Sequence, residues 1–279
     1  MAESGDRTPE YKLGVDIPQE SAVEVWNYLI VDGKEKLKDT AFITGGQFSQ
    51  RDIDTLKKYY QDVLDYEEDK FGEKGAVFNR SLLEHYSLGE RLGEFAAPLV
   101  GIDSNLFKAV ILTHDFGREF SHRRGRNNVA ADSLMKRIGF SESFMKLQPP
   151  DTLWTQIDEH SLKDRLERIT TEEGGMVGLI ELIDVLAKWK DKSTGSLRKW
   201  EDVIISSKTG QQTPDQKNMW PSELARQKKI TSNEGGRAIE IKYNYLKEWF
   251  EEKSGKKIDD FIKEVENSLR EQPLKGNWI

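Results

Sequence analysis

All four histidines of the chain lie between residues 85 and 160, and they are the side chains best suited to metal binding or proton transfer near neutral pH. They are His85, His114, His122 and His160. Clustering of four residues is weak evidence on its own. The sequence around each histidine, and the carboxylates that accompany it, therefore decide what chemistry these residues do.

His85 lies on a predicted helix over residues 80–97, where Leu82, Gly89 and Leu92 share its face at the spacing of a core-facing stripe. The imidazole is therefore expected to point inward, with Gly89 leaving space one turn away. Two interpretations stay open for this residue. It is a functional ligand, or it is a core histidine that is satisfied by one hydrogen bond.

His114 and Asp115 follow an apolar helix predicted over residues 106–113 and precede Gly117. A pair at this position is either a helix cap with a surface acid or a functional pair. Asp184 stands inside an apolar run over residues 176–187, where a lone buried carboxylate would cost on the order of several kcal/mol unless it is paired, protonated or bound to a metal. Lys188, one turn further on, is the alternative source of a compensating charge.

Taken together, His85, His114, Asp115 and Asp184 offer two imidazoles and two carboxylates on three apolar helices. This mixed nitrogen and oxygen set suits Mn²⁺, Fe²⁺, Co²⁺, Ni²⁺ or Mg²⁺ better than a structural zinc site, which normally uses cysteine. The chain has no cysteine, which also excludes disulfides and a cysteine nucleophile.

The order of these residues resembles the H…HD…D motif of the HD superfamily of metal-dependent phosphohydrolases. His114 follows His85 by 29 residues, and Asp184 follows His114 by 70. The flanking sequences are also similar to that family: LLEHYSLGERL around His85, LTHDFGR around the His-Asp pair, and IDVLAK around Asp184. The resemblance spans about residues 78–190.

The resemblance implies an all-α fold with one metal ion, or in some branches two, among its helices. It implies hydrolysis of a phosphomonoester or phosphodiester bond by metal-activated water, with a small phosphorylated substrate of which a nucleotide is one candidate. His85, His114, Asp115 and Asp184 are the implied metal ligands, and Asp115 is an implied catalytic residue that bridges the ions where there are two.

His160 falls where two-metal branches of the family have an extra ligand. The other extra position is Arg126 in this chain, or is displaced to His122, and this departure favours one metal over two. His160 is then expected to be catalytic through the substrate phosphate or the leaving group; an exposed histidine at a helix end is the alternative.

A basic segment over residues 118–126 stands out in an acidic protein. Its Arg118, His122 and Arg126, together with Lys188, are the predicted substrate contacts, because guanidinium groups bind phosphate through charge-assisted hydrogen bonds. A solvated basic loop is the plain alternative. A second hypothesis for function follows from the same segment: a catalytically inactive helical module that binds nucleotide or RNA phosphate there.

Composition limits the classes of function. With 42 basic and 49 acidic residues the net charge is −7, so no overall field attracts a polyanion and nucleic-acid binding must be local. The N-terminal sequence lacks the pattern of a signal peptide, and no apolar run approaches the length of a membrane span. These features favour a cytoplasmic protein without membrane contact, and they leave its oligomeric state open.

Helical periodicity predicts an all-α fold, an HD-type helical bundle with an N-terminal helical annex and C-terminal helices. Residues 1–75 are predicted as the N-terminal helical extension and residues 76–279 as the HD-type domain. Further helices are expected at about 151–159, 176–190, 238–250 and 258–269, and the helix over 80–97 is expected to stop near Pro98. A loop-rich insertion is expected at about 191–236, with the length of a lid or substrate-side segment.

Overall fold

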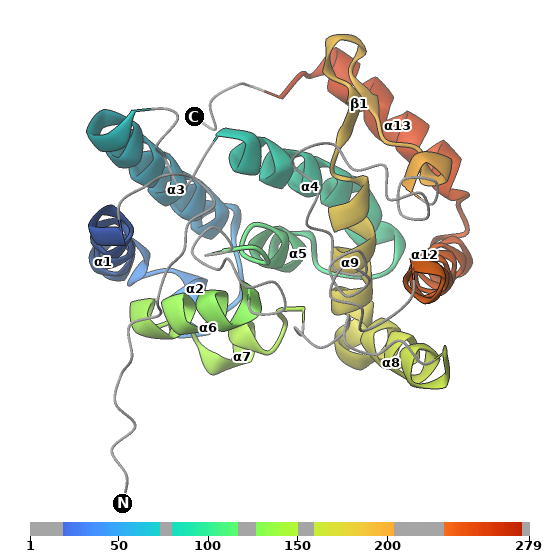
Figure 1. Cartoon of the computed structure of the whole chain (residues 1–279), viewed down its shortest axis with the longest axis horizontal. Helices are drawn as coiled ribbons and strands as arrows, with labels where there is room; N and C mark the ends of the chain where they lie inside the picture. The colour runs from blue at the N-terminus through green and yellow to red at the C-terminus, as the bar shows by residue number, and fades with distance from the viewer. Residues whose placement is uncertain (1–18, 73–79, 117–126, 150–158, 204–231, 275–279) are drawn as a thin grey trace, which may run out of the picture.

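The computed structural model describes residues 19–72, 80–116, 127–149, 159–203 and 232–274 of the 279-residue chain. These residues are mostly helical and include one two-stranded hairpin, so the predicted all-α class is confirmed (Figure 1). In chain order the elements are α1 (Gln19–Leu37), α2 (Ala41–Thr44), α3 (Gln50–Phe71), α4 (Arg80–Leu99), α5 (Ser104–Ile111), α6 (Asn127–Ile138), α7 (Glu142–Met145), α8 (Glu159–Thr171), the 3-10 helix η3 (Glu172–Gly175), α9 (Met176–Leu186), β1 (Trp189–Asp191), the 3-10 helix η4 (Lys192–Thr194), β2 (Ser196–Leu197), α12 (Ser232–Ser254) and α13 (Ile258–Glu271).

Local sequence explains where the helices around the centre begin and end. Ser49 and Asp52 form a capping box at the start of α3, each side chain accepting from the other residue's backbone N–H. Asp103 caps α5 by accepting from the backbone of Leu106 at 2.8 Å. Gly45 ends α2 with a φ of 71°, in the left-handed region that favours glycine. The Asp103 cap fixes the start of α5, and the turn after the other end of α5 carries His114.

Helices α4, α5 and α9 pack against one another, and α5 lies in the middle of the molecule (Figure 1). Two glycines of α4 permit the close approach of α5. A Cβ at Gly93 would lie 2.0 Å from the ring of Phe107, and a Cβ at Gly89 would lie 2.9 Å from the side chain of Ile111. The space that the sequence predicts beside His85 is therefore filled by α5.

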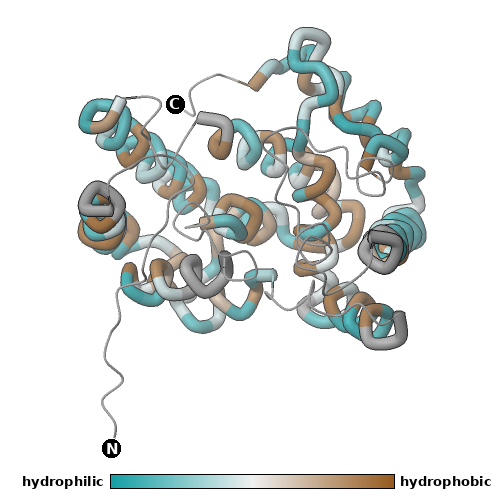
Figure 2. Tube along the Cα trace, in the orientation of Figure 1, coloured by the Kyte–Doolittle hydropathy of each residue, from teal (hydrophilic) through white to brown (hydrophobic). Residues whose placement is uncertain are grey.

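The N-terminal helices share the core of the rest of the protein. Side chains from α1 through α13 form one buried apolar cluster, and the hydrophobic residues in Figure 2 face the interior. The Tyr60 hydroxyl on α3 donates to the carbonyl of Leu112, just after α5, at 2.7 Å. The predicted boundary at residue 75 lies in 73–79, outside the described residues, so the division into two domains stays a prediction.

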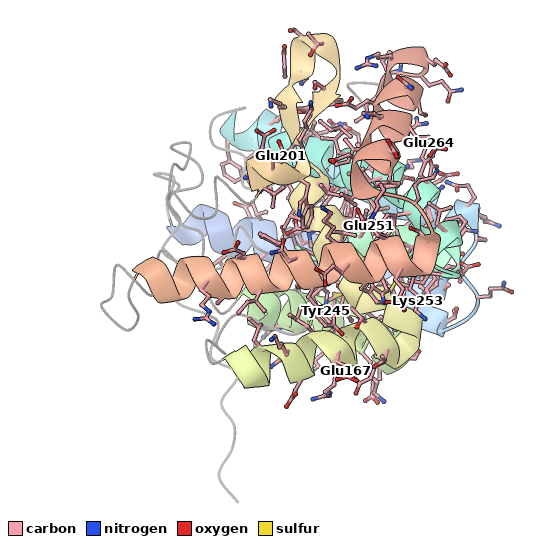
Figure 3. All side chains as sticks on the ribbon, turned by 90° about the vertical axis from the view of Figure 1, so that its right-hand side faces the viewer. Glu167, Glu201, Tyr245, Glu251, Lys253 and Glu264 are labelled. Carbon is pink, nitrogen blue, oxygen red and sulfur yellow. The ribbon has the colours of Figure 1, made fainter. Side chains whose placement is uncertain are left out.

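Of the two C-terminal helices, α12 covers α8 and α9, whereas α13 packs against α4 and β2. Figure 3 shows α12 crossing this face with α8 on one side and α13 on the other. Tyr245 of α12 lies with its hydroxyl 3.5 Å from the Thr170 hydroxyl of α8. At the junction of the two C-terminal helices, Glu251 accepts from the backbone of Ile258 at 3.0 Å. Among the described helices, none combines the length and the hydropathy that a membrane crossing requires.

Several element boundaries differ from those predicted. Helix α4 ends at Leu99 and contains Pro98 in its last turn, where the proline lacks one backbone N–H donor but does not end the helix. The helix predicted at about 151–159 falls on residues 150–158, outside the described residues, and the helix that the structure describes next, α8, begins at Glu159. The signal for α8 was the spacing of Leu162, Leu166 and Ile169 in a highly charged segment.

Helix α9 ends at Leu186 rather than near residue 190, because Ala187 leaves helical geometry with a ψ of 51°. The expected loop-rich insertion starts as the β1–β2 hairpin, residues 204–231 lie outside the described part, and α12 begins at Ser232 instead of about 238. Local turn chemistry explains the hairpin: the Asp191 side chain accepts from Ser193, and Gly195 has a φ of 67°. The strands are too short for periodicity to predict them.

Candidate metal centre

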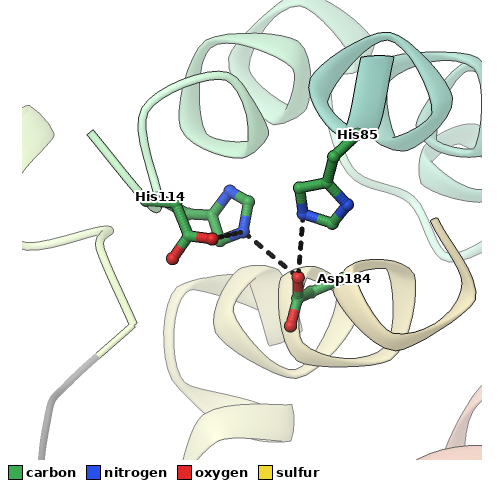
Figure 4. Close-up of side chains that lie close together, drawn as sticks. His85, His114 and Asp184 are labelled. Atoms are coloured by element: carbon green, nitrogen blue, oxygen red, sulfur yellow. Dashed lines mark hydrogen bonds and ion pairs between the residues drawn. The ribbon is translucent and has the colours of Figure 1, made fainter. Parts of the chain in front are cut away.

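Three elements bring the predicted ligands together. His85 comes from the first half of α4, His114 and Asp115 from the turn after α5, and Asp184 from the last turns of α9 (Figure 4). One ligand atom from each of the four side chains lies within 4.8 Å of all the others. The four residues that the motif joins across 99 positions of sequence are therefore neighbours in space.

Asp184 is the common contact of the two histidines. Its Oδ1 lies 3.0 Å from His85 Nε2 and 3.4 Å from His114 Nε2, as the dashed lines of Figure 4 show. His114 Nε2 also lies 3.6 Å from Asp115 Oδ2. Both Nε2 atoms thus point at the carboxylates, which is the arrangement of a ligand set converging on one ion.

The other nitrogen of each ring faces a backbone carbonyl. His85 Nδ1 lies 2.9 Å from the Ala187 oxygen, and His114 Nδ1 lies 2.7 Å from the Ile111 oxygen. Because a carbonyl only accepts, each Nδ1 carries a hydrogen and donates it. In a neutral ring, Nε2 then has no hydrogen and presents its lone pair. Metal-binding histidines are oriented in this way by partners behind the ring.

His85 provides a test of whether a cation fits here. Its Nε2 is buried and has no aligned hydrogen bond within the described part of the chain, although a carboxylate oxygen lies 3.0 Å away. A lone pair and an anionic oxygen at that distance repel each other unless a proton or a cation lies between them. The donor set therefore fits a divalent metal ion.

The turn that carries His114 and Asp115 is held firmly. The Thr113 hydroxyl donates to the carbonyl of Ala109 at 2.9 Å and accepts from the Gln148 amide at 3.0 Å. The hydrogen bond from Tyr60 to the Leu112 carbonyl fixes the residue before it. The His-Asp pair is thus positioned by α3, α5 and the segment after α7.

The electrostatics of the centre favour anionic carboxylates and a bound positive charge. Burial alone would raise the pKa of Asp184, but the contacts with His114 and His85 outweigh it and hold that pKa well below its usual range. Burial likewise lowers the pKa of His114, while the charge of Asp115 and the contact with Asp184 raise it to about 9. Without metal, His114 is therefore the cation that the two carboxylates require.

The structure distinguishes among the alternatives for single residues. His85 is more than a core histidine with one hydrogen bond, because its second nitrogen faces Asp184. His114 and Asp115 do not form a plain cap with a surface acid, since the His114 side chain is only 6% exposed and contacts Asp184. Asp184 itself is paired with the two imidazoles, and Lys188 follows the end of α9 instead of lying one helical turn along it.

Four other predicted residues are not brought into this cluster by the described part of the structure. Arg118, His122 and Arg126 lie in residues 117–126, outside the described residues. His160 is the second residue of α8, but the description does not extend to its side chain. Their substrate-binding and catalytic roles, and that of Lys188, stay predictions.

A buried ion pair next to the centre was not predicted from the sequence. Glu181, three residues before Asp184 on α9, pairs with Lys242 of α12, whose side chain is 1% exposed. The sequence contains a signal for one partner, because Glu181 is a second carboxylate inside the apolar run of residues 176–187. Lys242 lies 61 residues away in an unremarkable segment, so only the fold joins the two.

No family model, curated protein or solved structure matches this chain. The four candidate ligands lie together in one cluster, and a backbone carbonyl lies behind each of the two imidazoles.

Proposed function

We propose that this protein is an HD-type metal-dependent phosphohydrolase that cleaves a phosphomonoester or phosphodiester bond. The observation that carries the proposal is the convergence of His85, His114, Asp115 and Asp184, with their ligand atoms within 4.8 Å of one another. The resemblance of the H…HD…D motif supplies the reaction class, and the geometry supports it because the same four residues meet.

The donor set indicates which metals fit. Two imidazole nitrogens and two carboxylate oxygens suit Mn²⁺, Fe²⁺, Co²⁺, Ni²⁺ or Mg²⁺. Ions of this group prefer more than four ligands, so four protein donors leave positions open for small ligands. Four donors suffice to hold one ion, and the choice of one ion over two stays the prediction made from the sequence.

A divalent ion held here would supply Lewis-acid activation of water and of a phosphoryl group. The chain contributes the rest. His85 and His114 present Nε2 with their Nδ1 protons already committed to Ala187 and Ile111, so neither ring has to reorient on loading. Asp184 keeps 36% of its side chain exposed, whereas His114 keeps 6%, so solvent and substrate reach the centre from the side of Asp184.

Hydrolysis of chromogenic esters tests this function. We expect the Mn²⁺-loaded chain to hydrolyse p-nitrophenyl phosphate or bis(p-nitrophenyl) phosphate, and the preference between them separates a phosphatase from a phosphodiesterase. Asp184→Asn is expected to lower the rate by at least about a hundredfold, because it removes a ligand charge. Asp69→Asn changes an exposed carboxylate of α3 in the same way and serves as the matched control.

Two results would contradict the proposal. Turnover by Asp184→Asn at the rate of Asp69→Asn would separate hydrolysis from this centre. A wild-type chain that retains metal, hydrolyses no ester and binds RNA with strong salt dependence would support the inactive binding module instead.

A further inference from the structure

The β1–β2 hairpin returns the chain to the metal centre. Trp189 pairs with Leu197, and the next residue, Arg198, donates its backbone N–H to the carbonyl of Lys188 at 2.9 Å. Lys188 directly follows Ala187, whose carbonyl accepts from the ligand His85. The backbone of Arg198 therefore lies beside the segment that closes the centre.

The side chain of Arg198 is half-buried without a carboxylate partner in the described part of the chain. Its Nη2 donates to the backbone carbonyl of Asp202 at 3.4 Å, which is a long hydrogen bond. The Asp202 carboxylate instead pairs with Lys190 at 2.8 Å. A guanidinium has five N–H donors, so this arginine keeps donors available for another acceptor.

The guanidinium lies within electrostatic reach of the centre. Burial lowers the pKa of Arg198, and the charges of Tyr243, Asp202 and Asp184 oppose that effect. Asp184 is itself a predicted metal ligand. An arginine stays protonated in such a setting, so the hairpin carries a permanent positive charge that interacts electrostatically with Asp184.

We propose that Arg198 binds the phosphoryl oxygens of the substrate beside the metal centre. This inference rests on the proposed function. A planar guanidinium forms paired, charge-assisted hydrogen bonds with phosphate, and a half-buried one without a carboxylate partner is pre-organised for an incoming anion. Arg198 comes from the loop-rich region that the sequence marks as a substrate-side insertion, and it was not among the predicted substrate contacts.

Binding of inorganic phosphate to the full-length Mn²⁺-loaded chain tests the role of Arg198. Isothermal titration calorimetry is run on wild type, Arg198→Gln, Arg198→Lys and Arg168→Gln, with manganese per chain measured for each. Arg168 is exposed on α8 and pairs with Glu172, so Arg168→Gln is the matched control. We expect Arg198→Gln to weaken phosphate binding at least about tenfold with unchanged manganese content, and Arg198→Lys to restore part of the affinity.

The outcomes separate this inference from the proposed function. Phosphate affinity of Arg198→Gln within about twofold of wild type would overturn the inference, as would absent phosphate binding by wild type or a parallel loss of manganese. If wild type and Arg198→Gln hydrolyse esters at equal rates, the inference about Arg198 is overturned while the proposed function stands. Phosphate binding that needs Arg198, in a wild-type chain that hydrolyses no ester, would support the anion site and contradict only the proposed function.

Discussion

His85 Nδ1 lies 2.9 Å from the carbonyl oxygen of Ala187, so a ligand on α4 is oriented by the residue that ends α9. The same end of α9 presents Asp184, whose Oδ1 lies 3.0 Å from the other nitrogen of that ring. Ala187 leaves the helix with a ψ of 51°, and the N–H of Lys188 donates to Leu186 at 2.7 Å. The geometry of this turn therefore determines the orientation of His85.

Lys188→Pro is expected to weaken Mn²⁺ binding by about 10- to 100-fold, the usual effect of disturbing a residue that orients a metal ligand. Proline removes the N–H that bonds Leu186, and it restricts the preceding residue, so the Ala187 carbonyl turns away from His85. Lys188→Ala keeps the backbone bond and is the control. Equal Mn²⁺ affinity of the two variants by calorimetry would show that the turn does not orient His85.

Mn²⁺ affinity is expected to increase between pH 7 and about 9 and to level off above that range. The pKa of His114 is about 9 in the metal-free protein, so an ion must displace its proton before Nε2 becomes a ligand. Titrations under argon at several pH values measure the slope, which should approach one proton released per ion. An affinity independent of pH over this interval would contradict the assignment of His114 as a protonated ligand.

Stability of the metal-free protein is expected to show the opposite dependence. Because the folded pKa of His114 is raised above 6.5, its contribution of about 3 kcal/mol is fully present below pH 6.5 and is lost as pH rises through about 9. Asp184 has a lowered pKa in the folded protein, so its ionised form stabilises the fold above pH 3.8, the usual pKa of the group. This stabilisation is lost as the pH falls through the lowered pKa. Urea unfolding of wild type and His114→Gln measures this, and identical pH profiles for the two would contradict it.

Gly93→Ala is expected to destabilise the protein by about 2 kcal/mol or more, because its Cβ would lie 2.0 Å from the buried ring of Phe107. Gly89→Ala is the contrast. Its Cβ would lie 2.9 Å from Cγ1 of the buried Ile111, so the clash is smaller, and the helix propensity of alanine offsets about 1 kcal/mol of its cost. Urea unfolding should rank the two variants clearly; equal stability would show that α4 and α5 are less closely packed.

Glu181→Gln is expected to destabilise the fold by about 3 to 5 kcal/mol, because it leaves the buried charge of Lys242 without its partner. The double change Glu181→Leu with Lys242→Met removes both charges and should cost much less. Thermal unfolding of Glu181→Leu, Lys242→Met and the double variant gives the coupling between the residues. Additive losses would show that the pair does not stabilise the packing of α12 on α9.

The sequence was informative about the helices and about the four ligands. Apolar spacing in α1, α3 and α4 follows from which face each helix buries, and the nearly continuous apolar run of α9 follows from its burial on all sides. The apolar helix predicted before the His-Asp pair is α5, which ends two residues earlier than predicted, at Ile111. The motif joined residues 99 positions apart because chemistry requires particular side chains, whatever the path of the chain between them.

Other parts of the site depend on tertiary structure and had no local signal. The carbonyl of Ala187 supports His85 only because α9 ends one residue earlier, and carbonyls are common to every residue. Lys242 reaches Glu181 through the packing of α12. The backbone of Arg198 comes beside Lys188 through a hairpin of two- and three-residue strands. Periodicity cannot predict elements of that length.

Metal content per chain tests the central claim most directly. Wild type, His114→Ala, Asp115→Ala and the exposed control Asp69→Asn are incubated with Mn²⁺, desalted and subjected to elemental analysis, with circular dichroism to verify folding. The account predicts about one ion per chain in wild type and Asp69→Asn, and loss of that ion in both centre variants. Equal manganese in folded His114→Ala and wild type, or none in wild type, would contradict it.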